Sequence, residues 1–226
     1  MSDRLKSHVL LSRLPLFQGM SYSELDNVIA KVRLGFNKLG SGDIIVEEGQ
    51  LADGLTFILN GSVLAETCAD DRGYSVVEWL QVPCVLQPER IFGLTQRYSR
   101  TFRAETDCNI LYIGKSDILS LASSSEVFRL NLLNIVCTMT QRLQRQPWRT
   151  KPVGIRRKLF TFVANRCMRP AGKKILNIGM VRLGNEIGES RLNVSVELNA
   201  MDGEGLIVLK KSKIIIPALE VGLKTT

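Results

Sequence analysis

The chain has 226 residues, 45% of them hydrophobic, which is enough for a packed core and excludes a wholly disordered protein. Its one histidine, His8, and its five scattered cysteines exclude a close-spaced zinc or iron–sulfur cluster and offer little for histidine-dependent catalysis. The formal net charge is +8, but residues 1–146 carry −1 and residues 147–226 carry +9, so only the C-terminal part is suited to a polyanion.

Nothing in the sequence indicates a membrane protein. No apolar run reaches the roughly 18 residues that a membrane-spanning helix needs. The N-terminal stretch MSDRLKSHVLLSRLPLF has one basic patch but neither a long apolar region nor a small-residue cleavage site. A cytoplasmic protein without a membrane partner is therefore expected.

The N-terminal part is predicted to form a helix followed by a β-rich domain. Ser21 precedes a helical pattern of apolar residues, and Glu24 follows it by three residues, which is the pattern of a capping box. From residue 33 to residue 113, short β-rich runs such as LTFILNGSVLAE alternate with glycine-containing turns. Several short strands at regular spacing are typical of a β-barrel or a sandwich.

Residues 115–146 change to a helical pattern with a short and a long helix. The long helix is apolar over much of its circumference, because Leu130, Leu133 and Cys137 widen a continuous apolar stripe. Such a helix must be covered on more than one side. We expect the barrel on one side and the same helix of a second copy on the other, with burial within one chain as the alternative. The stripe of this dimer helix consists of Phe128, Leu132, Ile135, Met139 and Leu143.

Pro147 cannot continue the helix, and the residues after it are predicted to form a linker. An amphipathic helix, IRRKLFTFVANRC, and a short strand, KILNIG, follow. Residues 180–198 then have the pattern of a helix-turn-helix. Gly184 is expected to let the two helices approach closely, and Gly188 to end the first helix at positive φ. Ser190 is expected to cap the second helix.

The outer face of the second helix is predicted to contact DNA bases and phosphates. Arg191 can donate two hydrogen bonds to guanine, Leu192 can touch a thymine methyl group, and Asn193 can pair with adenine or a phosphate. The KKSK turn that follows is predicted to be the tip of a two-stranded wing that contacts phosphates. The predicted DNA contacts are Arg182, Ser190, Arg191, Leu192, Asn193, Ser195, Lys210, Lys211 and Lys213.

From about Leu14 to Leu219 the chain resembles bacterial transcription regulators of the Crp/Fnr family. The resemblance rests on LFQGMSYSELDNV, KLGSGDIIVEEGQLADGLTFILNGSV, RAETDCNILYI and, most specifically, SRLNVSVELNAMDGEGLIVLKKSKIIIP. It implies an α+β protein that binds double-stranded DNA as a homodimer on a two-fold-symmetric operator, with RNA polymerase as an open candidate partner. The implied domains are a jelly-roll effector domain (1–114), a short helix with the dimerisation helix (115–146) and a winged helix-turn-helix (147–226).

The chain departs from the cyclic-nucleotide binders of this family at the phosphate-binding cassette. Those proteins carry a glutamate for the ribose hydroxyl and an arginine for the phosphate. Aligned on RAETDC, the Arg-Ser pair of the family falls on Tyr98 and Ser99, and Glu89 lies one position beyond the glutamate. Strand alternation places Arg100 on the same face as Tyr98, so Arg100 is the candidate substitute. The candidate effector-binding residues are therefore Glu89, Tyr98, Ser99 and Arg100.

The leading hypothesis is a transcription regulator whose effector is unidentified and is not cyclic AMP. The alternative is a cyclic-nucleotide-gated regulator that uses Arg100 as the phosphate ligand. A barrel enzyme of the cupin type would need histidine ligands for a metal on the barrel, and the barrel has none. A protein-interaction module would not need the basic helix-turn-helix. The sequence thus predicts no enzyme, no metal site and no cofactor.

Overall fold

The computed structural model describes residues 2–224 of the chain, which fold into two compact units. The first unit runs to Val63 and resumes from Leu80 to Arg145. The second unit contains the chain from Gln146 onward together with an earlier segment, Leu64–Trp79. The second unit is thus assembled from two parts of the sequence that are far apart.

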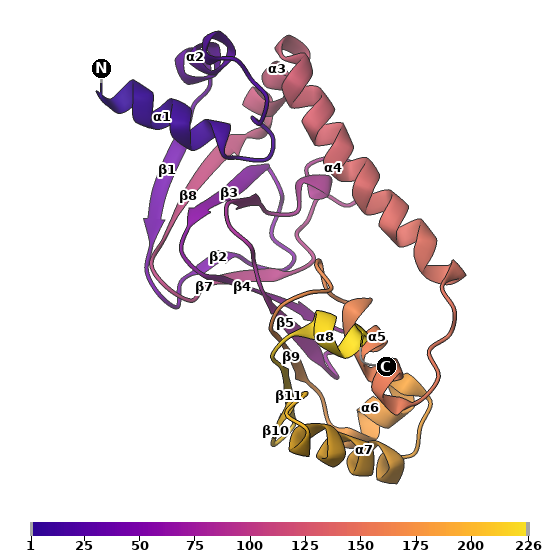
Figure 1. Cartoon of the computed structure of the whole chain (residues 1–226). Coiled ribbons are helices and arrows are strands. Elements are labelled where there is room, and N and C mark those ends of the chain that lie inside the picture. The colour runs from indigo at the N-terminus through magenta and orange to yellow at the C-terminus, as the bar shows by residue number, and fades with distance from the viewer. Residues whose placement is uncertain (1, 225–226) are drawn as a thin grey trace. The chain divides into compact units, whose positions relative to one another are not determined.

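The first unit is a jelly-roll-like set of antiparallel strands with helices before and after it (Figure 1). One sheet has the strand order β1-β8-β3-β6, and β2 pairs with β7. Its helices are α1 (Ser2–Ser12), α2 (Tyr22–Lys31), α3 (Lys115–Ser124) and α4 (Glu126–Arg145), and a 3-10 turn, η1, spans Pro88–Arg90. Its strands are β1 (Gly35–Leu39), β2 (Ile44–Val46), β3 (Gly54–Asn60), β6 (Cys84–Val85), β7 (Thr101–Ala104) and β8 (Cys108–Gly114).

The core of the first unit joins the N-terminal segment, the barrel and α4. The Phe17 ring lies 5.9 Å from the Phe57 ring and 5.4 Å from the Phe128 ring, measured between centroids. All three side chains are fully buried. Burial of each such ring stabilises the fold by roughly 1.5–3 kcal/mol, so Phe128 anchors the start of α4 to its own barrel. The predicted capping box at the start of α2 is confirmed, because Ser21 and Glu24 exchange both hydrogen bonds.

The second unit consists of a five-stranded sheet segment with the order β10-β11-β9-β5-β4 and the C-terminal helices. Its helices are α5 (Ile155–Ala164), α6 (Met180–Ile187), α7 (Arg191–Gly203) and α8 (Leu219–Lys224), and a 3-10 turn, η2, spans Gln146–Trp148. Its strands are β4 (Val63–Cys68), β5 (Ser75–Trp79), β9 (Lys174–Asn177), β10 (Val208–Lys210) and β11 (Lys213–Ile216).

The hairpin β4–β5 belongs to the second unit because β5 adds directly to β9. The two strands are antiparallel, with Ser75 opposite Asn177 and Glu78 opposite Lys174. Val76 joins the core of this unit, whose larger members include Phe160 and Leu198. Residues 64–79 are therefore an integral part of the C-terminal sheet.

A buried ion pair fixes this strand pairing. The Lys174 Nζ lies 3.6 Å from the Glu78 Oε2, and the two side chains are 1% and 3% exposed. Glu78 also accepts hydrogen bonds from the backbone N–H groups of Met168 and Arg169, and Lys174 donates to the carbonyl of Ala171. Both charges are thus hydrogen-bonded as well as paired, as buried charges must be.

The fold class predicted from the sequence is confirmed: the chain is α+β, with a jelly-roll-like domain, a long helix and a C-terminal helical domain with a hairpin. Helices were expected at residues 155–167 and 180–187, and α5 and α6 occupy these places. The domain boundaries at 114 and 146 stay a prediction. α8 was not predicted, and its Gly222 lets the Phe160 ring pack against the helix.

Replacing Lys174 by Met is expected to lower the free energy of unfolding of the second unit by about 3–5 kcal/mol, because Glu78 would remain as an unpaired buried charge. Urea unfolding monitored by circular dichroism measures this change. The matched control is Lys173→Met, since Lys173 is exposed and its Nζ lies 4.4 Å from the centroid of the Trp79 ring. The Lys173→Met replacement should lower the free energy of unfolding by no more than about 1 kcal/mol. Equal stability of the two variants would contradict the role of the buried pair.

Candidate nucleic-acid interface

Two short helices, α6 and α7, form a helix-turn-helix in the second unit (Figure 1). α6 ends at Gly188, whose φ of +67° lies in the left-handed region that glycine adopts at low cost. A Cβ on Gly184 would lie 2.7 Å from the carbonyl oxygen of Glu189, so the turn can pass this close only over a glycine. The predicted roles of both glycines are confirmed.

The second helix, α7, has one buried and one exposed face. Ser190 caps it, because its Oγ accepts a hydrogen bond from the backbone N–H of Asn193 at 3.1 Å. Val194 and Leu198 are fully buried against the core of the unit. This packing fixes which side chains of α7 point outward.

The exposed face of α7 carries the predicted base-reading residues. Arg191, Leu192 and Asn193 are exposed in the first turn, and Ser195 is half-buried one turn later. Leu192 is 72% exposed and Val196 is 63% exposed, so this face also presents apolar groups to solvent. Side chains of this kind can read guanine, adenine and the thymine methyl group in a major groove.

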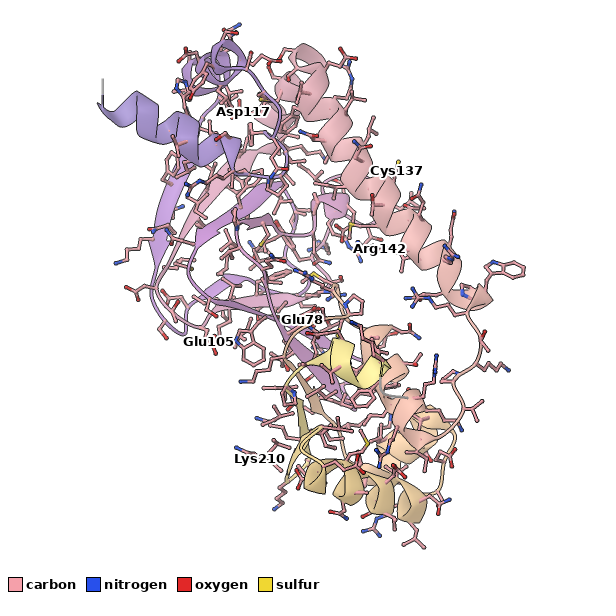
Figure 2. The ribbon with its side chains drawn as sticks, in the orientation of Figure 1. Glu78, Glu105, Asp117, Cys137, Arg142 and Lys210 are labelled. Carbon is pink, nitrogen blue, oxygen red and sulfur yellow. The ribbon has the colours of Figure 1, made fainter. Side chains whose placement is uncertain are left out.

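The predicted wing is a two-stranded hairpin of β10 and β11. Lys210 and Lys213 are opposite each other in the strand register, and Lys211 lies in the turn between them. All three are exposed, and Lys210 projects outward from the hairpin (Figure 2). Like charges placed directly opposite destabilise a hairpin, so the arrangement favours a polyanion that neutralises them.

The acidic side chains around the helix-turn-helix are tied to α5. Arg156 holds Glu204 through two hydrogen bonds of 2.5 and 2.6 Å and also donates to Glu197. Lys158 pairs with Glu189 in the turn at 2.5 Å. The hydrogen bonds from Arg156 hold the pKa of the Glu204 carboxyl below its usual value. These pairs neutralise the carboxylates that would otherwise oppose an approaching polyanion.

Arg182, at the start of α6, was predicted to contact DNA. Its Nη1 lies 2.8 Å from the Asp71 Oδ2 and its Nη2 lies 2.9 Å from the Glu186 Oε1. The guanidinium is also 5.6 Å from the centre of the Tyr74 ring. Two carboxylates therefore hold Arg182, in contrast to the exposed Arg191.

The candidate effector residues lie in the first unit around η1. Tyr98 is only 5% exposed, and burial raises the pKa of its hydroxyl. Gln87 bonds Ser99 twice: its Nε2 donates to the Ser99 Oγ at 2.8 Å, and its Oε1 accepts from the Ser99 N–H at 3.0 Å. The Glu89 Oε2 is buried without a hydrogen-bond partner, and Arg100 is half-buried. The candidate effector residues thus lie beside side chains of the chain itself, with Gln87 bonded to Ser99 and Tyr98 buried.

The predicted dimer-helix residues divide between two environments. Phe128 and Leu132 are buried in the core of the first unit, and Ile135 packs against that core. Met139 is half-buried and Leu143 is 64% exposed. Leu143 lies on the same stripe as Leu132 and Met139. The apolar side chains exposed on the other side of α4 are Leu130, Leu133 and Cys137, the last of which is labelled in Figure 2.

Sequence reasoning missed the residues that hold the site in place. Asp71 lies 111 positions before Arg182, and Glu78 lies 96 positions before Lys174. No local pattern connects such distant residues. Only the turn sequence ADDRGY, with its glycine and acidic residues, indicated that Asp71 would lie at the tip of a hairpin.

The barrel is recognised as a known domain. Residues 36–125 match the model of the family described as the cyclic nucleotide-binding domain. A search of curated proteins finds no match. Among the described residues, no helix is long and apolar enough to cross a membrane, and no group of three or more His, Cys, Asp or Glu side chains could hold a metal ion. The matched residues include most of β1, the strands β2 to β8 and all of α3.

Three solved structures of regulatory proteins are similar in fold to this chain. The catabolite activator protein of Thermus thermophilus is 18% identical, with 92% of this chain and 96% of that chain covered and a TM-score of 0.52. A putative Crp/Fnr-family regulator of Eubacterium rectale is 17% identical, with 93% and 98% covered and a TM-score of 0.53. The sensor domain of the regulator DNR of Pseudomonas aeruginosa is 16% identical, with 69% and 100% covered and a TM-score of 0.53. The resemblance to the Crp/Fnr family is thereby confirmed at the level of the fold.

Cyclic AMP and cyclic GMP are expected not to bind, because Tyr98, which the sequence alignment predicted in place of a phosphate-binding arginine, is buried. Isothermal titration calorimetry and thermal-shift measurements test this on the full chain, with a cyclic-AMP-binding regulator of the same fold as the positive control. Saturable heat with one ligand per barrel would contradict the expectation. If that heat were lost in Arg100→Ala, Arg100 would be the substitute phosphate ligand.

Proposed function

We propose that this chain is a sequence-specific DNA-binding transcription regulator that acts as a homodimer and does not use cyclic AMP as its effector. The observation that carries the proposal is the outer face of α7, where Arg191, Leu192 and Asn193 are exposed at the start of a capped helix. In helix-turn-helix proteins the N-terminal residues of the second helix contact base edges in the major groove.

The wing supports the same function through the DNA backbone. Lys210, Lys211 and Lys213 are exposed on one hairpin, and each phosphate that such a lysine neutralises releases a bound counterion. This gives affinity that falls with salt but carries no sequence information. Sequence choice then rests on α7, where Leu192 and Val196 add apolar contacts that suit thymine methyl groups.

The exposed apolar face of α4 supports a homodimer. Leu130 and Leu133 are 48% and 52% exposed, one turn apart on a helix whose opposite side packs on the barrel core. A second copy of the helix would cover this face, and Cys137 lies one turn further along the same face. A two-fold dimer would read two half-sites about 34 Å apart, one turn of the DNA helix.

Replacing Arg191 by Ala is expected to weaken binding to the selected operator by about 1–3 kcal/mol and to leave binding to unrelated DNA almost unchanged. The operator is first obtained by selection from random DNA, and affinities are then measured by fluorescence anisotropy. Arg169→Ala is the matched control, because Arg169 is an exposed arginine outside the helix-turn-helix. The Arg169→Ala replacement removes the same charge and should weaken binding to the operator and to unrelated DNA slightly and equally.

The assignment of Arg191 to base contact would be wrong if its replacement weakened binding to all DNA sequences to the same extent. Failure of the selection to enrich any sequence would overturn the proposed function itself.

Replacing Leu133 by Glu is expected to convert the dimer into a monomer, because two carboxylates would face each other between the helices. Sedimentation velocity measures the change. The matched control is Leu119→Glu, since Leu119 on α3 is 49% exposed and lies outside the α4 face. A chain that stays dimeric with Glu at position 133 would exclude this face as the dimer interface.

A further inference from the structure

The tip of the β4–β5 hairpin reaches the first helix of the helix-turn-helix. β5 is held to β9 by its strand pairing, and the Asn177 amide donates to the Ser75 Oγ at 2.9 Å. Ser75 in turn donates to the Glu66 carboxylate at 2.7 Å. The turn that joins β4 to β5 is therefore fixed relative to α6, which begins three residues after β9 ends.

The turn is built to present the Asp71 carboxylate. The backbone N–H of Ala69 donates to the carbonyl of Tyr74, which closes the turn. The Asp71 Oδ1 accepts a hydrogen bond from the Gly73 N–H at 3.0 Å, while its Oδ2 lies 2.8 Å from the Arg182 Nη1. The Gly73 hydrogen bond is also the main reason why the pKa of Asp71 is lowered, with Arg182 as a smaller contribution. Asp71 thus stays charged in its contact with Arg182.

Arg182 has the position and the chemistry of a phosphate contact. In helix-turn-helix proteins the first helix crosses the DNA backbone while the second enters the groove, and Arg182 lies in the first turn of α6. A guanidinium binds phosphate through paired N–H groups. The Arg182 side chain is 39% exposed, so a phosphate can approach the same guanidinium that the two carboxylates contact.

We propose that Asp71 competes with the DNA backbone for Arg182, so that the β4–β5 turn regulates the affinity of the helix-turn-helix. In the structure described here, Asp71 neutralises Arg182 and also places a second negative charge beside it, where a phosphate would be repelled. While Asp71 holds Arg182, the arginine makes no contact with the DNA backbone, and it becomes available to a phosphate oxygen only when this pair is released. The inference rests on the proposed function, since it names the residue that regulates the same DNA-binding surface.

The test compares Asp71→Asn with Asp70→Asn in the full chain. Asparagine at position 71 keeps an oxygen for the Gly73 N–H, so the turn is retained while the charge facing Arg182 is lost. Asp70 is the exposed neighbour on the same turn, and its replacement removes the same unit of charge. Operator affinity is measured for each variant over a series of salt concentrations.

Asp71→Asn is expected to strengthen operator binding about 3- to 10-fold more than Asp70→Asn. The slope of the logarithm of affinity against the logarithm of salt concentration should also become steeper by about 0.9, the value for one added phosphate contact. A change in turn stability alone would not alter this slope.

A second replacement, Arg182→Gln, tests whether Arg182 is the residue through which the charge of Asp71 affects DNA binding. In the wild type it should have little effect on affinity, whereas in the Asp71→Asn background it should remove both the gain in affinity and the added slope. Circular dichroism confirms that each variant is folded.

The competition would be refuted if Asp71→Asn and Asp70→Asn bound the operator with equal affinity. It would also be refuted if the gain in affinity from Asp71→Asn persisted with Gln at position 182. Either result leaves sequence-specific binding by the wild type intact, so it differs from a failure of the proposed function, in which no variant discriminates operator from unrelated DNA.

Discussion

The antiparallel pairing of β5 with β9 is the constraint on which the second unit depends. It carries a hairpin from the middle of the cyclic nucleotide-binding sequence into the sheet that supports the helix-turn-helix. The Glu78–Lys174 pair fixes the register, because a shift by one residue would turn one of these two buried charges to the other face of the sheet. Without the hairpin, Lys174 would lose its carboxylate partner. The C-terminal residues alone therefore do not form a complete domain.

The excess positive charge of the C-terminal part is divided into two groups by the fold. Arg156, Lys158 and Arg182 are paired with carboxylates, so they stabilise contacts between elements. Arg191 and the three wing lysines are exposed, so they define the surface that attracts a polyanion. Net charge alone could not separate these groups, since a paired and an exposed arginine count equally. The separation depends on which carboxylates the tertiary structure brings near.

The sequence predicted the local features of the site and missed its long-range supports. Gly184, Gly188 and Ser190 could be assigned because each has a local steric or hydrogen-bonding requirement within one turn of chain. The periodicity of the α4 sequence indicated a helix covered on two sides, but it could not assign Phe128 and Leu132 to the core of their own chain. The contact of Asp71 with Arg182 has no signal of this kind, because it follows from the β5–β9 pairing. Resemblance to a family supplied the order of the elements but not these contacts.

The segments on either side of η1 are held together by the side chain of Gln87. Gln87 has a φ of +37°, an uncommon conformation for a residue other than glycine, and its amide bonds both the N–H and the hydroxyl of Ser99. These two bonds join the segment before η1 to the segment after it. The two segments around η1 are thus joined by side-chain and backbone groups of the chain itself, and the same turn contacts α4.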